Sequence, residues 1–130
     1  MPGKYKIGSD ICSIRRIEEV YDKFGERFLD RVLTPQEKSY VLSRKQKDDK
    51  LARLAGRFAA KEATSKVLGT GFIGVSWKEI EVLRLPSGAP QLRLSGRAQE
   101  RAQDLKLNHF ELTMSHEKDY AIAFVLGYGD

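Results

Sequence analysis

Cysteine and histidine are scarce in this sequence, and long apolar runs are missing. The single cysteine, Cys12, excludes an internal disulfide and is typical of a reducing compartment. No apolar run reaches about 18 residues, the length that a membrane span requires, and the opening MPGKYKIGSD lacks the apolar region of a signal peptide. Two histidines without neighbouring cysteines give no zinc-site spacing and no basis for a Ser-His-Asp triad. We therefore expect a cytoplasmic protein without a membrane segment.

Charge, in contrast, is plentiful and uneven. The 130-residue chain has a formal net charge of +5, and 41% of its residues are hydrophobic, too large a share for a disordered chain. This length suits one domain, so we predict a single domain over residues 1–130. Basic residues crowd the segments 15–31 and 44–50. This asymmetry favours a negatively charged partner, either nucleic acid, a phosphorylated small molecule or an acidic protein.

Residues 51–71 predict one long helix that ends at Gly69, because helix-forming residues dominate the segment and glycine is a favoured C-cap. An apolar stripe with the spacing i, i+3, i+4, i+7 runs along this helix: Leu51, Leu54, Ala55 and Phe58. Glu62 and Lys66 continue the stripe at positions where apolar groups are expected. Burying a charge is costly unless it is paired or bound to a metal, so this pair stands out.

A second, basic stripe shares another face of the same helix: Lys50, Arg53, Arg57 and Lys61. The two stripes together would suit a metal-bound polyphosphate. The alternative is an ordinary i,i+4 pair between Glu62 and Lys66, worth ~0.2–0.5 kcal/mol, beside a solvated basic face. Spacing alone leaves both interpretations open.

The remaining pattern predicts four further helices and five strands. The helices are expected at residues 14–25, 26–32, 34–42 and 97–107, with Thr34, Pro35 and Glu37 as a helix start and residues 43–50 as a connection. The strands are expected at residues 5–12, 78–85, 91–94, 110–115 and 120–128, and the last of them is apolar enough for a central strand. We therefore predict an α+β fold with a mainly antiparallel sheet wrapped on one long central helix.

Two polar residues at strand ends are candidates for a site. Asp10 stands near the end of the first predicted strand, where aspartate is disfavoured. It is either a ligand or the N-cap of the helix that follows. His116 ends a predicted strand, where it could serve a turn or point into a cleft. His109 begins a loop and has no pattern around it.

Three segments carry a resemblance to a known family. The first is IGSDI at residues 7–11 with Arg16 beyond it, and the second is GRFAAKEA at residues 56–63, followed by Lys66 and GTG at residues 69–71. The third is TMSH at residues 113–116, followed by YAIA at residues 120–123. Together, and nearly end to end, they resemble the small phosphopantetheinyl transferases of the holo-[acyl-carrier-protein] synthase family. Ser9 and Ala89 depart from the family pattern, which usually has an apolar and a basic residue there.

The resemblance implies transfer of 4′-phosphopantetheine from coenzyme A to a serine of an apo-acyl-carrier protein, with release of adenosine 3′,5′-bisphosphate, as in fatty acid biosynthesis. It implies that Asp10 and Glu62 hold Mg²⁺, a hard cation that takes one or two carboxylates together with substrate phosphates. Catalytic roles fall to Asp10, Glu62 and Lys66, with Glu62 the candidate for accepting the serine proton. The coenzyme-binding residues that the resemblance implies are Arg53, Arg57, Lys61, Lys66, Gly71 and His116.

The resemblance also implies two protein partners. Members of this size form homotrimers whose coenzyme clefts lie between subunits. The basic first helix, through Arg16, Lys23 and Arg27, would dock an acidic carrier protein, and complementary charge would speed their encounter. No nucleic-acid or membrane partner is expected.

Two other functions compete with this one. A basic nucleic-acid-binding module would explain the charge, but it gives no purpose to the carboxylate in the apolar stripe. A coenzyme A-binding protein without transferase activity would bind coenzyme A in the same cleft but transfer no phosphopantetheine.

Overall fold

The computed structural model describes residues 4–130. Its strands are β1 (Tyr5–Ser13), β2 (Ile80–Arg84), β3 (Pro90–Leu94), β4 (His109–His116) and β5 (Tyr120–Tyr128). Its helices are α1 (Ile14–Phe24), α2 (Glu26–Val32), α3 (Pro35–Leu42), α4 (Lys47–Leu68) and α5 (Gly96–Asp104), with a short 3₁₀ helix η1 (Trp77–Glu79). The expected absence of a signal peptide concerns a segment whose first three residues lie outside the described ones. The single-domain organisation over residues 1–130 stays a prediction.

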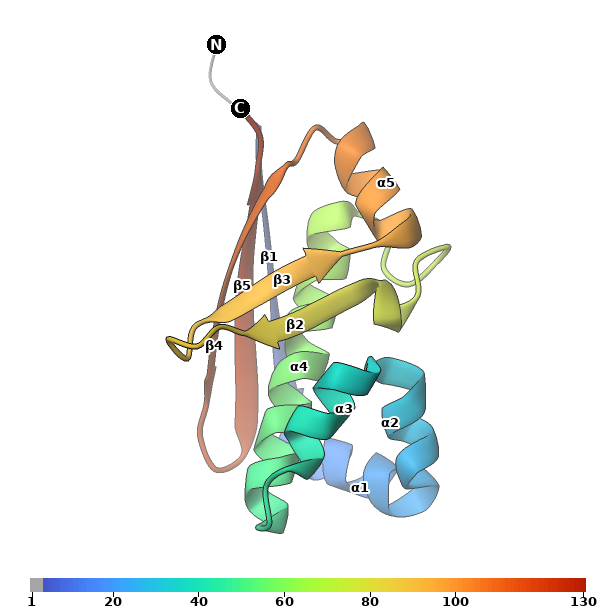
Figure 1. The fold of residues 1–130 in the computed structure, drawn as a ribbon, viewed down its shortest axis with the longest axis vertical. Helices are drawn as coiled ribbons and strands as arrows, with labels where there is room; N and C mark the ends of the chain where they lie inside the picture. Colours follow the sequence, from blue (N-terminus) through green and yellow to red (C-terminus); the bar gives the residue numbers. More distant parts are fainter. Residues whose placement is uncertain (1–3) are drawn as a thin grey trace.

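The mixed helical and antiparallel fold that we predicted is confirmed. β1, β5 and β4 form an antiparallel sheet with β5 in the centre, as its apolar sequence indicated, and α4 packs along one face (Figure 1). The β2–β3 hairpin forms a second, two-stranded sheet that crosses in front of α4 in this view. α1, α2 and α3 surround the first half of α4, while α5 lies near its other end. No helix within residues 4–130 combines the length and apolar composition that crossing a membrane demands.

The long helix α4 begins at Lys47, so our prediction of a connection over residues 43–50 was wrong for its second half. Asp48 and Asp49 lie in the first turn, where carboxylates stabilise the positive end of the helix dipole. Lys47 also reaches back to α1, with Nζ 3.2 Å from Glu18 and 3.3 Å from Asp22. The predicted end is confirmed, since Gly69 takes the left-handed conformation and its N–H bonds the carbonyls of Ser65 and Lys66.

Three other boundaries depend on local hydrogen bonds. The capping box of α3 is present as predicted, with Thr34 and Glu37 bonded to each other's backbone. The strand expected from residue 78 begins only at Ile80, because Ser76 starts η1 by bonding Glu79. α5 ends at Asp104, before the predicted residue 107, because Lys106 takes a positive φ of 61° and the chain turns into β4.

One close contact sets the distance between α4 and β1. A Cβ atom at Gly8 would lie 2.2 Å from the carbonyl oxygen of Ala63, so only glycine allows this approach. Asp10 follows two residues later on the same face of β1, and Glu62 precedes Ala63 on α4. The backbone contact therefore brings the two acidic residues to neighbouring positions.

On the opposite face of the three-stranded sheet, the part formed by β1 and β5 is largely apolar and exposed, whereas β4 contributes Glu111, Thr113 and Ser115. Side chains from β1 and β5 alternate onto it: Tyr5, Ile7, Ile11, Tyr120 and Phe124. Ile7 is 76% exposed and Ile11 is 65% exposed. A contiguous apolar patch of this kind marks an interaction surface.

Candidate active site

Asp10 and Glu62 line one cavity of about 390 Å³, although 51 residues separate them in the sequence. Asp10 comes from β1 and Glu62 from α4, and Arg16 of α1 lines the same cavity. Asp10 does not cap α1, because the Ser13 hydroxyl accepts the bond from the Arg16 N–H. The N-cap interpretation of Asp10 is therefore wrong, and its carboxylate faces the cavity instead.

The two carboxylates influence each other. Partial burial raises the pKa of Glu62, and the nearby Asp10 raises it further, while Lys66 acts in the opposite direction. Lys66 Nζ donates to Ser9 O at 2.8 Å and lies 3.3 Å from Asp10 Oδ1. The lysine thus bonds the strand rather than forming the simple i,i+4 pair with Glu62 that the sequence left open.

The cavity wall also holds the only cysteine. Burial raises the pKa of the Cys12 thiol to about 11, and Asp10 contributes in the same direction. A thiol with this pKa stays protonated at neutral pH, so Cys12 is a packed apolar group there.

The donor set fits a magnesium ion. Asp10 raises the pKa of Glu62, so a cation between the two carboxylates would be favourable, and Mg²⁺ completes its coordination with water and substrate phosphates. Within residues 4–130, no group of three or more His, Cys, Asp or Glu side chains is placed to hold a metal by itself. Any ion here would depend on Asp10, Glu62 and the bound substrate.

The structure contradicts the coenzyme-binding role that we expected for Lys61. This residue is fully buried, and Nζ donates to Glu37 Oε1 at 2.7 Å, to Trp77 O at 3.0 Å and to Ile80 O at 2.7 Å. All three of its protons are used inside the protein. The basic stripe seen in the sequence therefore breaks at Lys61, whose burial lowers its pKa against the effect of Glu37.

Arg53 and Arg57 lie on another side of α4, against Tyr40 of α3. Their guanidinium carbons stand 3.8 Å and 4.2 Å from the centre of the Tyr40 ring, and that of Arg84 stands 5.3 Å away. Arg57 is only 4% exposed, its Nε finds no acceptor within residues 4–130, and burial lowers its pKa. A cluster of three cations with an unpaired buried donor is suited to an anion.

The last two expected coenzyme-binding residues lie far apart in one chain. Gly71 follows the C-terminal end of α4, with φ at +55°. His116 lines a cavity with Asp48, Leu51 and Asp119, at the N-terminal end of the same helix. A helix of 22 residues is about 33 Å long, so the two residues lie toward opposite ends of one subunit.

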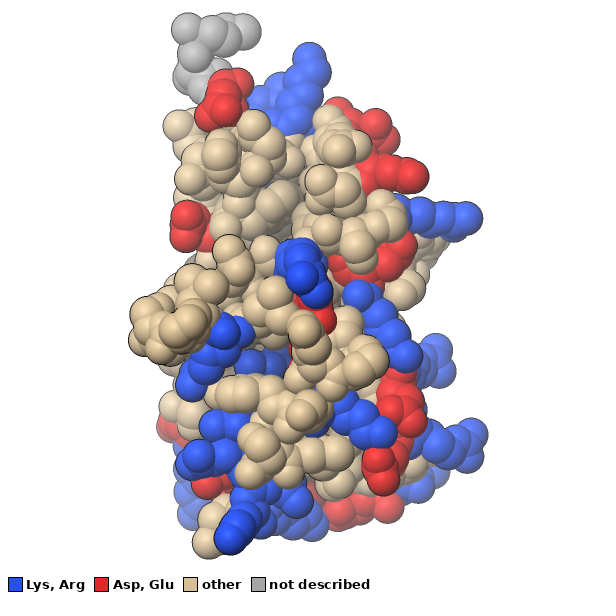
Figure 2. All heavy atoms as spheres, viewed as in Figure 1, with Lys and Arg blue, Asp and Glu red and all other residues tan. Residues whose placement is uncertain are grey.

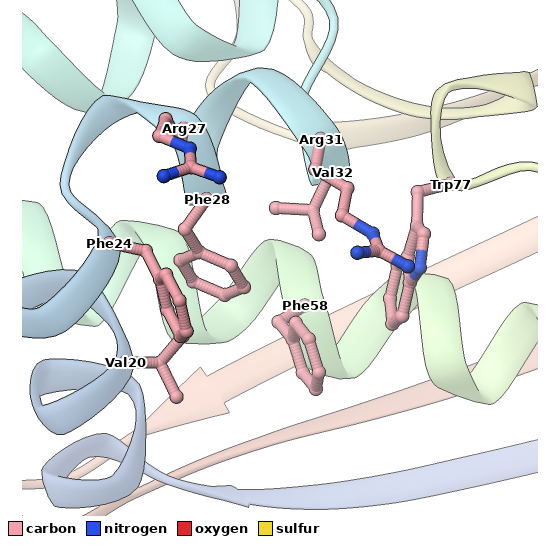
Figure 3. Close-up of a pocket in the computed structure, with 8 residues that line it drawn as sticks. All are labelled: Val20, Phe24, Arg27, Phe28, Arg31, Val32, Phe58 and Trp77. Carbon is pink, nitrogen blue, oxygen red and sulfur yellow. The ribbon is translucent and has the colours of Figure 1, made fainter.

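The predicted docking residues border a groove beside the cavity. Arg27 lines this groove, which has a volume of about 430 Å³, and Arg16 lines the adjoining cavity, with which the groove shares Val20, Phe28 and Phe58. Lys23 lies over the ring of Phe24, which also lines the groove. In Figure 3, aromatic side chains from α1, α2, α4 and η1 face the groove, and Arg31 extends toward Trp77.

Several residues that the structure brings to these sites, among them Arg31, Tyr40 and Arg84, had no predicted site role. Arg31 shares a helix face with Arg27, a signal that could have identified it. No sequence signal could have placed Tyr40 and Arg84 beside Arg57, because they come from three separate elements. Lys and Arg side chains gather over the lower half of the molecule in Figure 2, where α3 and the first half of α4 lie in Figure 1.

Comparison with known proteins identifies the family of this chain. The sequence model of the 4′-phosphopantetheinyl transferase superfamily matches residues 6–125. A holo-[acyl-carrier-protein] synthase of Halothermothrix orenii is 46% identical over 121 residues, which cover 93% of this chain and 94% of that protein.

Solved structures give the same result. The holo-[acyl-carrier-protein] synthase of Neisseria meningitidis superposes with a TM-score of 0.84 at 35% identity, over 94% of this chain and 96% of that one. The Helicobacter pylori enzyme, solved in complex with coenzyme A, superposes with a TM-score of 0.79 at 35% identity, over 93% and 98%. The chain therefore belongs to the 4′-phosphopantetheinyl transferase superfamily, and within it to the holo-[acyl-carrier-protein] synthases.

Proposed function

We propose that this chain transfers 4′-phosphopantetheine from coenzyme A to a serine of an apo-acyl-carrier protein, depends on Mg²⁺, and releases adenosine 3′,5′-bisphosphate. The observation that carries this proposal is the convergence of Asp10 and Glu62 on one cavity, with Lys66 at its edge. The coenzyme A complex of the Helicobacter pylori relative supports the choice of donor substrate.

Each polar group of the cavity has a role in this reaction. Asp10 and Glu62 would hold Mg²⁺, which would bind the diphosphate of coenzyme A and offset charge on the departing nucleotide. Lys66 is half exposed, so its ammonium can exchange Ser9 O and Asp10 for a substrate phosphate. Glu62 would accept the serine proton, directly or through a metal-bound water.

The nucleotide end needs a second set of residues. The cluster of Arg53, Arg57 and Arg84 around Tyr40 has the charge and the unpaired donor that a nucleotide phosphate requires. Arg57 lies five residues before Glu62 on α4, which turns it about 140° away around the helix axis. This cluster and the acidic cavity therefore face different sides of one subunit.

A homotrimer joins these two sides. We propose that each coenzyme cleft combines Asp10, Glu62, Lys66 and Gly71 of one subunit with Arg53, Arg57 and His116 of the next. The exposed apolar face of β1 and β5 supports such an assembly, since oligomer interfaces bury surfaces of this kind.

Subunit complementation tests the shared cleft. Glu62→Gln and Arg57→Ala chains should each be inactive alone. The two chains are then mixed in equal amounts, dissociated and reassembled. Of the four equally frequent pairings at a cleft, one combines the intact Glu62 side with the intact Arg57 side, so about one quarter of wild-type activity should return. Transfer activity and sedimentation are measured on the same samples.

A matched pair of variants controls this experiment. Ile7→Glu in both chains places a charge on the apolar sheet face and should prevent recovery, whereas Ile73→Glu should not. Ile73 is 88% exposed on a loop outside that face. Mixed trimers that remain inactive would show that each cleft belongs to a single subunit.

The carrier protein would dock on α1 and α2. Arg16, Lys23 and Arg27 supply positive charge, and the structure adds Arg31 on the rim of the same groove. An acidic helix of the carrier could place an apolar side chain among Phe24, Phe28 and the other aromatic residues. This end of the site leads directly into the cavity of Asp10 and Glu62, where the serine would react.

The function itself is tested by incubating the chain with coenzyme A, Mg²⁺ and an apo-acyl-carrier protein. Mass spectrometry should detect one added phosphopantetheine group, and EDTA should prevent the addition. Coenzyme A binding without transfer would favour a non-catalytic binding protein. Salt-dependent DNA binding together with indifference to coenzyme A would favour the nucleic-acid module. The single cysteine supports a cytoplasmic location for this reaction.

A further inference from the structure

A buried ion pair stands next to the proposed site without belonging to it. Lys61 and Glu37 are 0% and 1% exposed, and their side chains meet at 2.7 Å. Glu37 Oε1 also accepts from the Thr34 N–H at 2.9 Å, and Oε2 accepts from the Val82 N–H at 2.8 Å. With the three bonds that Lys61 Nζ donates, the pair is fully hydrogen-bonded.

The pair connects four elements that are separate in the sequence. Glu37 belongs to the capping box of α3, and Lys61 lies in the middle of α4. The Lys61 ammonium holds the carbonyls of Trp77 in η1 and of Ile80 at the start of β2. Thr34, which caps α3, also bonds the buried Glu81 of β2. These bonds fix η1 and the end of α2 relative to α4.

Those two elements contact each other and line neighbouring parts of the groove in Figure 3. Trp77 of η1 stacks on Phe58 at 4.8 Å and on Phe72 at 3.7 Å between ring centres. α2 supplies Arg27 and Arg31 and ends at Val32, two residues before Thr34. The placement of these two elements, and with it the shape of this part of the groove, therefore depends on bonds made by Lys61 and Glu37, although neither residue lines the groove.

We propose that Lys61 and Glu37 are positioning residues for carrier-protein docking. The inference rests on the proposed function, because it takes this groove as the docking site. Lys61 has no proton free for a coenzyme phosphate, and a buried ion pair need not add stability over an apolar pair of the same size. The structural consequence of the Lys61–Glu37 pair is therefore the placement of Trp77 and α2.

Lys61→Met tests this role, because it removes the ammonium and keeps an unbranched apolar side chain. The KM for the carrier protein should rise about tenfold or more, the scale expected of misplaced contacts. The KM for coenzyme A should stay within about twofold of the wild-type value. Trp77 is the only tryptophan of the sequence, so its emission spectrum and quenching by acrylamide should change as well.

The double variant Lys61→Met/Glu37→Gln separates positioning from stability. Lys61→Met alone leaves the Glu37 charge buried and unpaired, whereas the double variant does not. The double variant should therefore melt at a higher temperature than Lys61→Met. The carbonyls of Trp77 and Ile80 still lack their donor, so the raised KM for the carrier should persist. Thr64→Val is the matched control: it removes a buried hydrogen bond to Ala60 O on the same helix and should leave both KM values unchanged.

Two results would overturn this inference while the wild type transfers phosphopantetheine normally. One is an unchanged carrier KM and Trp77 emission in both Lys61 variants. The other is a rise in the KM for coenzyme A instead, which would return Lys61 to the coenzyme site. A wild type that transfers nothing would overturn the proposed function, and with it any docking role for the groove.

Discussion

Glu62→Gln should lower phosphopantetheine transfer by about 10²–10³-fold, the usual cost of losing one group that stabilises charge at a reaction centre. Glu62 is one of two carboxylates in the cavity, and the amide supplies neither a full negative charge for Mg²⁺ nor a base for the serine proton. Asp10→Asn should have a similar effect. Initial rates are measured at saturating coenzyme A and carrier protein.

The control for this change is Glu100→Gln, which alters an exposed carboxylate of α5 far along the chain from the cavity. It should leave the rate as it is. Full activity of Glu62→Gln would remove Glu62 from both proposed roles.

Glu62→Gln should also stabilise the fold at neutral pH. The pKa of Glu62 is raised by burial and by Asp10, so the folded state binds its proton more tightly than the unfolded state. Wild-type stability therefore falls as the pH rises from the ordinary carboxyl pKa through the raised one, and the glutamine variant escapes this loss. The gain stays below about 1 kcal/mol because solvent reaches the carboxyl. Melting curves at pH 4 and pH 7 check it, and equal gains at both would contradict the sign.

Reversing two charges at the groove should weaken the enzyme toward its carrier alone. Arg16→Glu/Arg27→Glu should lower kcat/KM for the acyl-carrier protein by roughly 10–100-fold, because like charges would face each other across the interface. The KM for coenzyme A should change less than that for the carrier, since neither residue belongs to the arginine cluster at Tyr40. The defect should shrink as salt is added, because salt screens exposed charges.

Arg15→Glu gives a control on the same helix. Arg15 pairs with Glu19 and lines neither the groove nor the cavity of Asp10 and Glu62. Each substitution changes the charge by the same amount, so Arg15→Glu reproduces any loss of kcat/KM that comes only from weaker long-range attraction of the carrier protein. Equal losses in the two variants, once corrected for the number of charges, would rule out docking at the groove.

The sequence predicted most of the elements because their signals are local. The capping residues of α3, the glycine after α4 and the alternation in β4 each act within a few residues, and the structure contains all three. The boundaries that failed depended on contacts across the chain. Lys47 begins α4 while bonded to α1, and at the start of β2 the Lys61 ammonium holds the carbonyls of Trp77 and Ile80 in addition to the local bond at Ser76.

The site shows the same division. The interruption of an apolar stripe by Glu62 identified one acid, and the resemblance supplied Asp10 as its partner. Lys61 looked like a member of a basic stripe, because helical spacing describes the faces of α4 but not what covers them. Here α3 and β2 cover the face of Lys61 completely, and the partner that neutralises it, Glu37, lies 24 residues away in the sequence.

The glycine at position 8 sets a limit on how this fold can be altered. Because the α4 backbone rests against the strand at that point, main-chain packing fixes how closely the backbones that carry the two acids approach. A redesign of this cavity could therefore change the side chains at positions 10 and 62, but any side chain at position 8 would first have to push the helix away from the strand.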